Sequence, residues 1–316
     1  MVRIVALMCF VGLLMPLFAA DEPGVELVAG RLSVDALVSS SAHWWQVEQS
    51  GLTHSAFVID RVSAPVELTG RLSPIASLRA SCDISILQPQ DLYVDLQWPD
   101  GLGMRAGQFK LPVGVDQMTD PGQTKLVSGS LLAAYARPVD VRDVGLSGAW
   151  TRDRVGAVLA VVDGNGPNAG DNNDRKDLCG RVVIKPWLGS GVELAVRGYY
   201  GWPDPAKAAW RTAAVEVMVE RKRLSLRAEL QNLESAELHN NAGYLQLACE
   251  TGIFEPACRV DLVLPRNEKA EFMATGGVSF RPLGDHLKFM LDGSYVRNLA
   301  DGTGAAVFFM RLQAAM

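Results

Sequence analysis

The chain has 316 residues, 48% of them hydrophobic, and charged residues, 21%, are spread along its whole length. The net charge of −5 is small and gives no reason to expect nucleic acid as a partner. Beyond the N-terminus, apolar residues interleave with charged ones and form no long apolar run. This composition favours a transmembrane β-barrel, although a soluble all-β protein could share the same averages.

The first 20 residues have the layout of a secretory signal peptide. Arg3 supplies a positive charge, residues 4–18 form an apolar run, and the small residues Ala19 and Ala20 follow. The run is shorter than the roughly 20 residues that a membrane-spanning helix needs. We therefore expect export and cleavage near Ala20, and the alternative is an uncleaved N-terminal anchor helix.

Alternation of apolar and polar residues with a period of two dominates from residue 25 onward, and predicts one all-β domain over residues 21–316. For example, Arg181, Val183 and Lys185 alternate with Val182 and Ile184. In a strand these two sets face opposite sides. A soluble sandwich shows the same alternation with its apolar face inward, so the loops must separate the two cases.

The predicted connections alternate between short turns, such as 99–102 and 220–223, and longer polar segments, such as 39–54, 111–142 and 163–177. Short periplasmic turns that alternate with longer outer loops are typical of bacterial outer-membrane barrels. Counting strands between the joints gives about 16, an even number that lets both termini lie on the periplasmic side. We therefore expect an antiparallel transmembrane β-barrel of about 16 strands in a Gram-negative outer membrane.

Five segments, in order, carry motifs that occur together in one known family. They are GRLSVDA (30–36), LYVDLQWPDGLGMRAGQFKLPVG (92–114), ARPVDVRDVGLSG (136–148), NGPNAGDNNDRKDLCGRVVIKPW (165–187) and the closing FFMRLQ (308–313). Together they resemble the phosphate-selective porin O and P family. The resemblance implies a 16-stranded trimeric barrel with an inward-folded third loop and an anion-conducting pore. The chain is short for that family, ends in Ala-Ala-Met rather than in an aromatic residue, and shows no compact ladder of pore arginines.

Nine basic residues are candidates for the pore lining or its constriction. Strand parity places several of them on the inward face together with a similar number of acidic residues, which predicts a nearly neutral lumen. The alternative for each is a water-facing wall charge that pairs across strands. The candidates are Lys110, Lys125, Arg137, Arg142, Arg181, Lys185, Arg197, Arg227 and Arg311.

The connection 111–142 is much longer than the others, and loops of this length inside compact folds are usually functional or disordered. We expect it to enter the lumen and narrow it, with a short helix within the apolar segment 126–135 packed on the barrel wall. Lys125, Arg137 and Arg142 would then present positive charge to the passage. The alternative is a segment that lies over the outer mouth.

Cys249 and Cys258 flank the turn 250–257 and are candidates for a disulfide, which an oxidising periplasm permits. The alternative is two free thiols. The acidic segment 163–177 fails the calcium-loop pattern, because Pro167 and Arg175 fall where oxygen ligands are needed. The four histidines lack metal-ligand spacing. We therefore predict neither a metal site nor a cofactor.

No nucleophile elbow or phosphate-binding glycine-rich loop is present in the sequence, so an enzyme is not expected. The favoured function is a porin for passive diffusion of small hydrophilic solutes, leaning to anions or phosphate. The alternative is a closed-lumen barrel that serves as a structural or surface-interaction protein. The expected partners are outer-membrane lipid, small solutes or anions, and further copies of the chain, as a trimer by the family resemblance.

Overall fold

The computed structural model describes residues 25–27, 32–49, 52–60, 62–135, 142–202, 209–235, 239–266, 270–300 and 302–316. The predicted signal peptide (1–20) and Arg137 lie outside these ranges.

The strands are β1 (Val25–Leu27), β2 (Leu32–Gln49), β3 (Leu52–Ile59), β4 (Pro65–Arg71), β5 (Ala76–Asp83), β6 (Gln88–Gln97), β7 (Leu102–Lys110), β8 (Arg142–Arg152), β9 (Val155–Val162), β10 (Asp177–Ile184), β11 (Val192–Gly201), β12 (Trp210–Arg221), β13 (Leu224–Glu234), β14 (His239–Cys249), β15 (Phe254–Pro265), β16 (Glu271–Phe280), β17 (Leu287–Asn298) and β18 (Gly304–Ala315). The helical segments are α2 (Val115–Met118), η2 (Pro121–Gln123), α3 (Leu131–Tyr135) and η3 (Gly284–His286).

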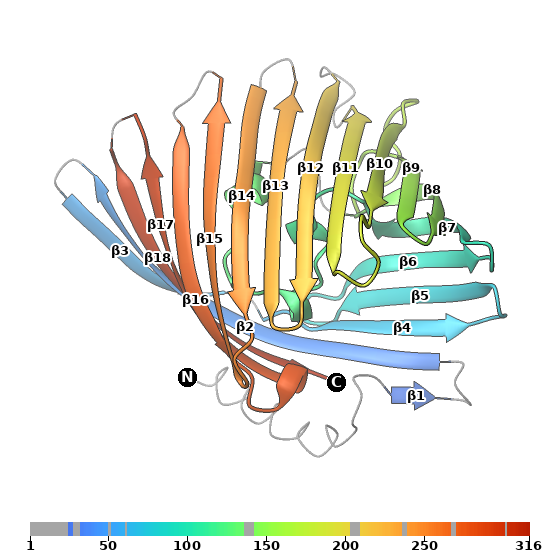
Figure 1. The fold of residues 1–316 in the computed structure, drawn as a ribbon, viewed down its shortest axis with the longest axis horizontal. Helices are drawn as coiled ribbons and strands as arrows, with labels where there is room; N and C mark the ends of the chain where they lie inside the picture. Colours follow the sequence, from blue (N-terminus) through green and yellow to red (C-terminus); the bar gives the residue numbers. More distant parts are fainter. Residues whose placement is uncertain are drawn as a thin grey trace.

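The strands form one closed antiparallel barrel (Figure 1). Each strand from β4 onward pairs with the next, and β18 closes the ring by pairing with β2. Along its other edge, β2 pairs first with β4 and then with β3, so β3 and β4 act as one interrupted strand. With β1 set aside as a short extension, the wall therefore counts 16 strands, as the sequence predicted.

The outer surface of the barrel is apolar and its inner surface is polar, and β15 shows this most simply. Val260, Leu262 and Leu264 are exposed on the outside, whereas Arg259 and Asp261 alternate with them and are buried inside. The ring of strands is closed, and an apolar exterior of this kind is stable only in lipid. The chain is therefore an outer-membrane barrel, as predicted.

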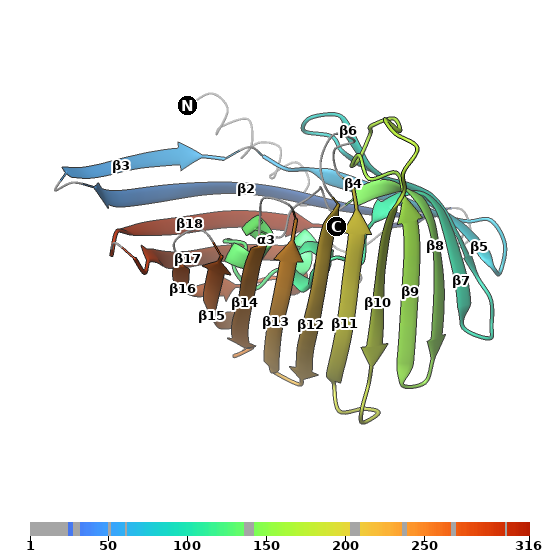
Figure 2. The ribbon, with the colours of Figure 1, turned by 90° about the horizontal axis from the view of Figure 1, so that it is seen from above.

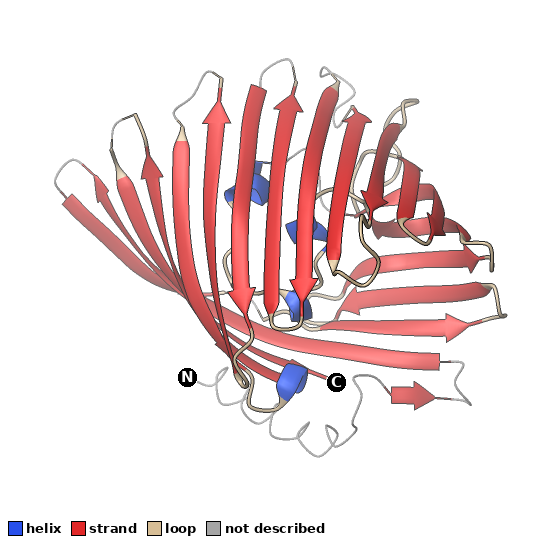
Figure 3. Ribbon diagram, in the orientation of Figure 1, coloured by secondary structure: helices blue, strands red, loops and turns tan. Residues whose placement is uncertain are grey.

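The helical segments of residues 115–135 lie inside the ring of strands (Figure 3). No helix among the described residues is long and apolar enough to cross a membrane. The hairpin turns at one end of the barrel are short, such as Asp153–Arg154 between β8 and β9. The connections at the other end include the long segments 111–141 and 163–176.

The segment 39–54, predicted as a long outer loop, is instead most of a hairpin between β2 and β3. Ser39, Ser41 and His43 alternate with outward residues, and their polar character reflects an inward face rather than a loop. Trp44, which follows His43, faces outward and packs on Phe308 of β18, with ring centroids 5.6 Å apart. The sequence prediction was wrong here because a lumen-facing strand carries as many polar residues as a loop.

The predicted disulfide between Cys249 and Cys258 is not formed, and both residues carry free thiols. The register of β14 and β15 places Leu247, not Cys249, opposite Cys258. The two cysteines are thus diagonal neighbours, and such pairs are about 7–8 Å apart. A disulfide needs Cα atoms within about 7 Å, so the hairpin register accounts for the missing bond.

Candidate pore and its constriction

The segment after β7 turns into the barrel instead of covering its mouth (Figure 2). Its first residue, Leu111, is 2% exposed and packs with Phe109 and Tyr199 in a small apolar cluster inside the wall. At its far end, Leu132 of α3 packs against Tyr244 of β14 and Val263 of β15. We call residues 111–135 the inner loop. Two apolar clusters therefore hold its ends against two different parts of the wall.

Buried carboxylates of the wall accept hydrogen bonds from backbone N–H groups of the inner loop. They come from alternate strands, β13, β15 and β17, so they form a row along one side of the lumen. Hydrogen bonds to ionised acceptors are roughly twice as strong as neutral ones. The pairs are Glu229 Oε2 with Val115 N at 3.0 Å, Asp261 Oδ1 with Leu131 N at 3.0 Å, and Asp292 with Val127 N at 2.9 Å and Ser128 N at 3.0 Å.

Basic residues of the same wall bind carbonyl groups of the inner loop. The Arg259 guanidinium donates to Ser128 O at 3.0 Å and to Gly129 O at 2.5 Å. Lys288 donates to Thr124 O. Many of the inward charges on β13 to β18 thus bind the loop backbone instead of facing open water. The inner loop is fixed to this half of the barrel.

A passage with a volume of about 1030 Å³ remains inside the barrel, bounded by the inner loop, by β4 to β8 and by the short-turn ends of strands from β12 to β17. It is lined by eight cationic and eight acidic residues, so its formal charge is balanced. The cations are Arg79, Arg105, Lys110, Lys125, Arg142, Arg227, Arg281 and Lys288; the acids are Asp35, Glu67, Asp91, Asp120, Glu220, Glu250, Glu255 and Asp285.

In three ion pairs of the passage, the cation is more exposed than its carboxylate. Lys125 Nζ lies 2.5 Å from Glu255 Oε1, with side chains 17% and 1% exposed. Arg142 Nε lies 2.8 Å from Asp91 Oδ1, with side chains 20% and 8% exposed. Arg79 bound to Glu67 shows the same order. At these three pairs a passing ion meets the cation before its carboxylate. Lys110 and Asp120, 2.8 Å apart, show the opposite order, with side chains 23% and 58% exposed.

The order is reversed at the short-turn end of the passage. Glu220 is 54% exposed and its partner Arg227 only 12%. Asp285 is 81% exposed, whereas Arg281, which binds it and Glu250, is 13% exposed. Ion pairs of both orders therefore line the passage, and its formal charge is balanced.

The nine basic residues predicted for the pore fall into two groups. Lys110, Lys125, Arg142 and Arg227 line the passage. Arg181 and Arg197 are instead held by Glu216 of β12, at 2.8 and 3.0 Å, and Lys185 pairs with Glu193 at 3.1 Å. Arg311 reaches Val127 O of the inner loop at 3.4 Å. Arg137 lies outside the described residues.

Arg79 and Arg105 line the passage but were absent from the sequence-based candidates. Arg105 binds Asp95 at 3.1 Å and lies over the Tyr93 ring at 4.1 Å. Its strand contains three glycines or alanines around a short apolar face, so inward and outward positions are hard to distinguish from sequence. Met104 precedes Arg105 and is exposed on the outside of the barrel. This apolar residue therefore indicates that Arg105 faces inward.

The acidic outer segment between β9 and β10 forms ion pairs of its own. Lys176 Nζ binds Asp163 at 3.0 Å and also binds Asp171. The hydrogen bond from Lys176 lowers the pKa of the Asp171 carboxyl and raises that of the lysine. Among the described residues no group of histidine, cysteine and acidic side chains is arranged to hold a metal ion.

No family model and no curated protein matches the sequence. Solved structures match the fold. An anion-selective porin from Comamonas acidovorans has a TM-score of 0.69 at 10% identity, over 90% of this chain and 99% of that one. The chain has the fold of an outer-membrane porin. OprB of Pseudomonas putida also has a TM-score of 0.69 at 10% identity, over 90% of this chain and 94% of that one. The channel DcaP of Acinetobacter baumannii has a TM-score of 0.64 at 6% identity, over 93% of this chain and all of that one.

The porin fold is thus shared with several channels. The sequence identities to them are so low that they support the fold alone. The resemblance to the phosphate-selective porin O and P family is not tested by these matches, and it stays a prediction. Any preference among solutes must be argued from the residues that line the passage.

Proposed function

We propose that this chain is a porin that lets small hydrophilic solutes diffuse across the outer membrane. The observation that carries the proposal is the charged passage left between the inner loop and β4 to β8. A lumen sealed for a structural role would have apolar side chains packed across this space, and here charged side chains line it instead. The main alternative, a closed-lumen surface protein, differs in a single measurable property, conductance.

Purified protein in a planar lipid bilayer should produce discrete conductance steps that grow with the KCl concentration. The steps are expected because charged side chains line the passage, and ions cross such a pore without leaving water. Heat-modifiable migration on a gel would verify that the inserted protein is folded. A folded barrel that produces no steps would support the closed-lumen alternative.

We further propose a preference for anions. In the ion pairs of Lys125 and Arg142 the cation is more exposed than its carboxylate, which favours anions beside these two pairs. The printed title of one structural neighbour calls that protein anion-selective. A preference for phosphate in particular rests on the family resemblance, and a drop in chloride current on addition of phosphate would support it.

A trimer is proposed from the outer surface near β3. One edge of β3 pairs with β2, and its other edge pairs with none of the described strands. An unpaired strand edge at an apolar surface is unfavourable unless something covers it. Trp44, Phe57 and Phe308 lie side by side in one outward row across β3, β2 and β18, with Phe57 57% and Phe308 55% exposed. A neighbouring copy would cover both the edge and this aromatic row.

The substitutions Phe57→Ala and Phe308→Ala together should convert trimers to monomers in mild detergent, because large aromatic contacts dominate such interfaces. Chemical crosslinking and size-exclusion chromatography with light scattering would measure the change. The matched control is Leu230→Ala with Leu264→Ala, two outward apolar residues on β13 and β15. Equal trimer fractions in both variants would place the interface elsewhere.

A further inference from the structure

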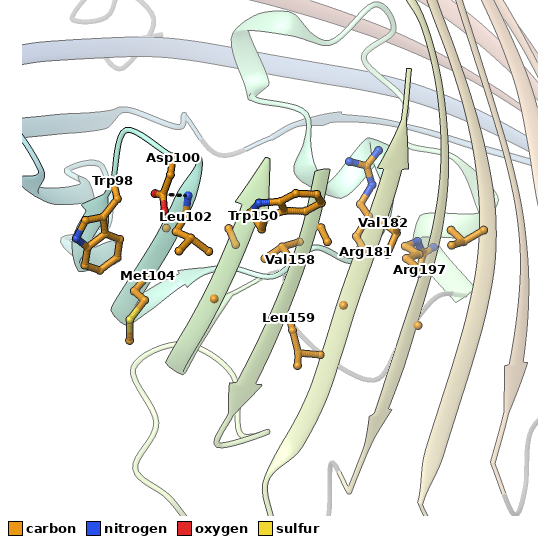
Figure 4. Close-up of a pocket in the computed structure, with 17 residues that line it drawn as sticks. Trp98, Asp100, Leu102, Met104, Trp150, Val158, Leu159, Arg181, Val182 and Arg197 are labelled. Carbon is orange, nitrogen blue, oxygen red and sulfur yellow. Dashed lines mark hydrogen bonds between the residues drawn. The ribbon is translucent and has the colours of Figure 1, made fainter. Parts of the chain in front are cut away.

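A groove of about 820 Å³ runs across the outer wall of β7 to β11, far from the aromatic row of the proposed trimer (Figure 4). Its volume falls within the range of small-molecule sites. Arg181 and Arg197 belong to these strands, but both side chains turn inward to Glu216. The groove is thus lined mainly by apolar side chains and glycine backbone.

The groove exists because three of five neighbouring residues in one outward row of the sheet are glycines. The strand register places Met104, Gly148, Leu159, Gly180 and Gly198 next to one another across five strands. A Cβ atom at Gly148 would meet nothing within 4 Å, so the space above this residue is open. In the next row toward the short turns, Trp150 and Val182 are partly exposed and form one side of the groove.

Charged groups of both signs lie at the short-turn end of the groove. Arg152 is exposed at the outward end of β8, two residues beyond Trp150, and Arg154 is exposed in the following turn. Neither side chain has an ion-pair partner among the described residues. Asp100 lines the groove from the neighbouring turn, which a hydrogen bond from Thr151 N to Gly101 O, 2.9 Å long, holds beside Arg152.

We propose that this groove binds one phospholipid of the periplasmic leaflet whose headgroup carries a phosphate and an ammonium, as in phosphatidylethanolamine. An acyl chain lies over Gly148, Gly180 and Gly198. The phosphate meets Arg152 and Arg154, since arginine binds phosphate through charge-assisted hydrogen bonds, and the ammonium meets Asp100. Trp98 and Trp150 lie at the depth where tryptophan favours the boundary between headgroups and acyl chains.

The short turns identify the leaflet. In bacterial barrels the short turns face the periplasm, where the inner leaflet of the outer membrane lies. The occupant is therefore a phospholipid rather than a lipid of the outer leaflet. This inference depends on the apolar exterior and the barrel orientation, and not on conductance, because no side chain of the passage takes part.

The test is native mass spectrometry of delipidated, detergent-solubilised protein titrated with phosphatidylethanolamine or phosphatidylglycerol. The wild type should retain one phosphatidylethanolamine at low lipid concentration. Gly148→Leu with Gly198→Leu fills the groove, and the Cβ positions of both residues have room for the change. The matched control is Ala228→Leu, which enlarges an outward residue of β13 away from the groove.

The groove variant should lose most of the bound lipid, whereas Ala228→Leu should retain it. Arg152→Gln with Arg154→Gln should weaken binding of both lipids by about tenfold, the value of one charge-assisted hydrogen bond. The control for the loss of positive charge is Arg71→Gln, which removes an arginine at a short turn far from the groove. Asp100→Asn should abolish the preference for phosphatidylethanolamine over phosphatidylglycerol.

Equal lipid retention by the wild type and the groove variant would overturn the proposal, as would a wild type without a retained lipid. Heat-modifiable migration verifies folding, and Gly198→Leu alone is the second variant if the double substitution does not fold. Single-channel conductance should be the same in all of these variants. Failure of the lipid proposal therefore leaves the proposed porin function untouched.

Discussion

Substitution Asp292→Ala should release the middle of the inner loop and raise the single-channel conductance, with larger current fluctuations. The Asp292 carboxylate accepts two hydrogen bonds, from Val127 N at 2.9 Å and Ser128 N at 3.0 Å. Each hydrogen bond to a charged group contributes roughly 1.5–3 kcal/mol, so the loop loses a large part of its attachment. The loop then samples positions away from β17, and the passage fluctuates in width.

The control for this substitution is Asp143→Ala. Asp143 is also a buried wall carboxylate that accepts backbone hydrogen bonds, from its neighbour Val144 N in β8 at 2.7 Å and from Gly164 N in the outer segment after β9 at 2.8 Å. Both variants should lose stability, and only Asp292→Ala should change the conductance. Replacement of residues 116–134 by a short glycine-serine linker removes most of the inner loop and should give the largest increase in conductance. Unchanged current in all three variants would show that the inner loop does not narrow the pore.

The loop attachment illustrates what the sequence could predict and what it could not. The length of the segment 111–142 was enough to predict that it enters the lumen, and α3 (Leu131–Tyr135) lies within the apolar stretch expected to form a helix. The wall residues that bind the loop were not predictable. Alternation along a strand tells whether a residue faces the lumen or the lipid, but not how deep in the barrel it lies. In the sequence analysis every inward acidic residue counted as a pore charge, although two of them, Asp261 and Asp292, accept hydrogen bonds from the loop backbone.

Alternation along single strands also cannot give the pairing between strands, which explains the wrong disulfide prediction and the basic residues wrongly expected to line the pore. Alternation identified the outward cysteines on β14 and β15, but a shift of two positions between the strands decides whether a disulfide forms. Arg181 and Arg197 were correctly placed on the inward face, and Glu216, which binds both of them, lies on a strand that follows in the sequence. Pairing between strands depends on register, and register is set by the closed ring as a whole rather than by any single segment.

The selectivity of the pore should shift toward cations when Arg79, Arg105 and Lys125 are replaced together by glutamine. Each of these side chains pairs with a less exposed carboxylate, namely Glu67, Asp95 and Glu255. Glutamine keeps much of the side-chain volume and removes the charge, so the three carboxylates are left as the net charge of the constriction. Rings or clusters of acidic side chains favour cations.

The measurement is the reversal potential across a bilayer that separates two KCl concentrations, and its sign reports which ion crosses more readily. The shift should be large at about 0.1 M salt, where the Debye length is about 10 Å, and small at about 1 M, where it is about 3 Å. Glu67→Gln should shift the potential in the opposite direction, because it leaves Arg79 unpaired. Arg152→Gln, on the outer wall, should leave it unchanged. If the triple variant kept the wild-type reversal potential at low salt, the exposed cations of the inner-loop region would not set the selectivity, and the anion preference would lose its structural basis.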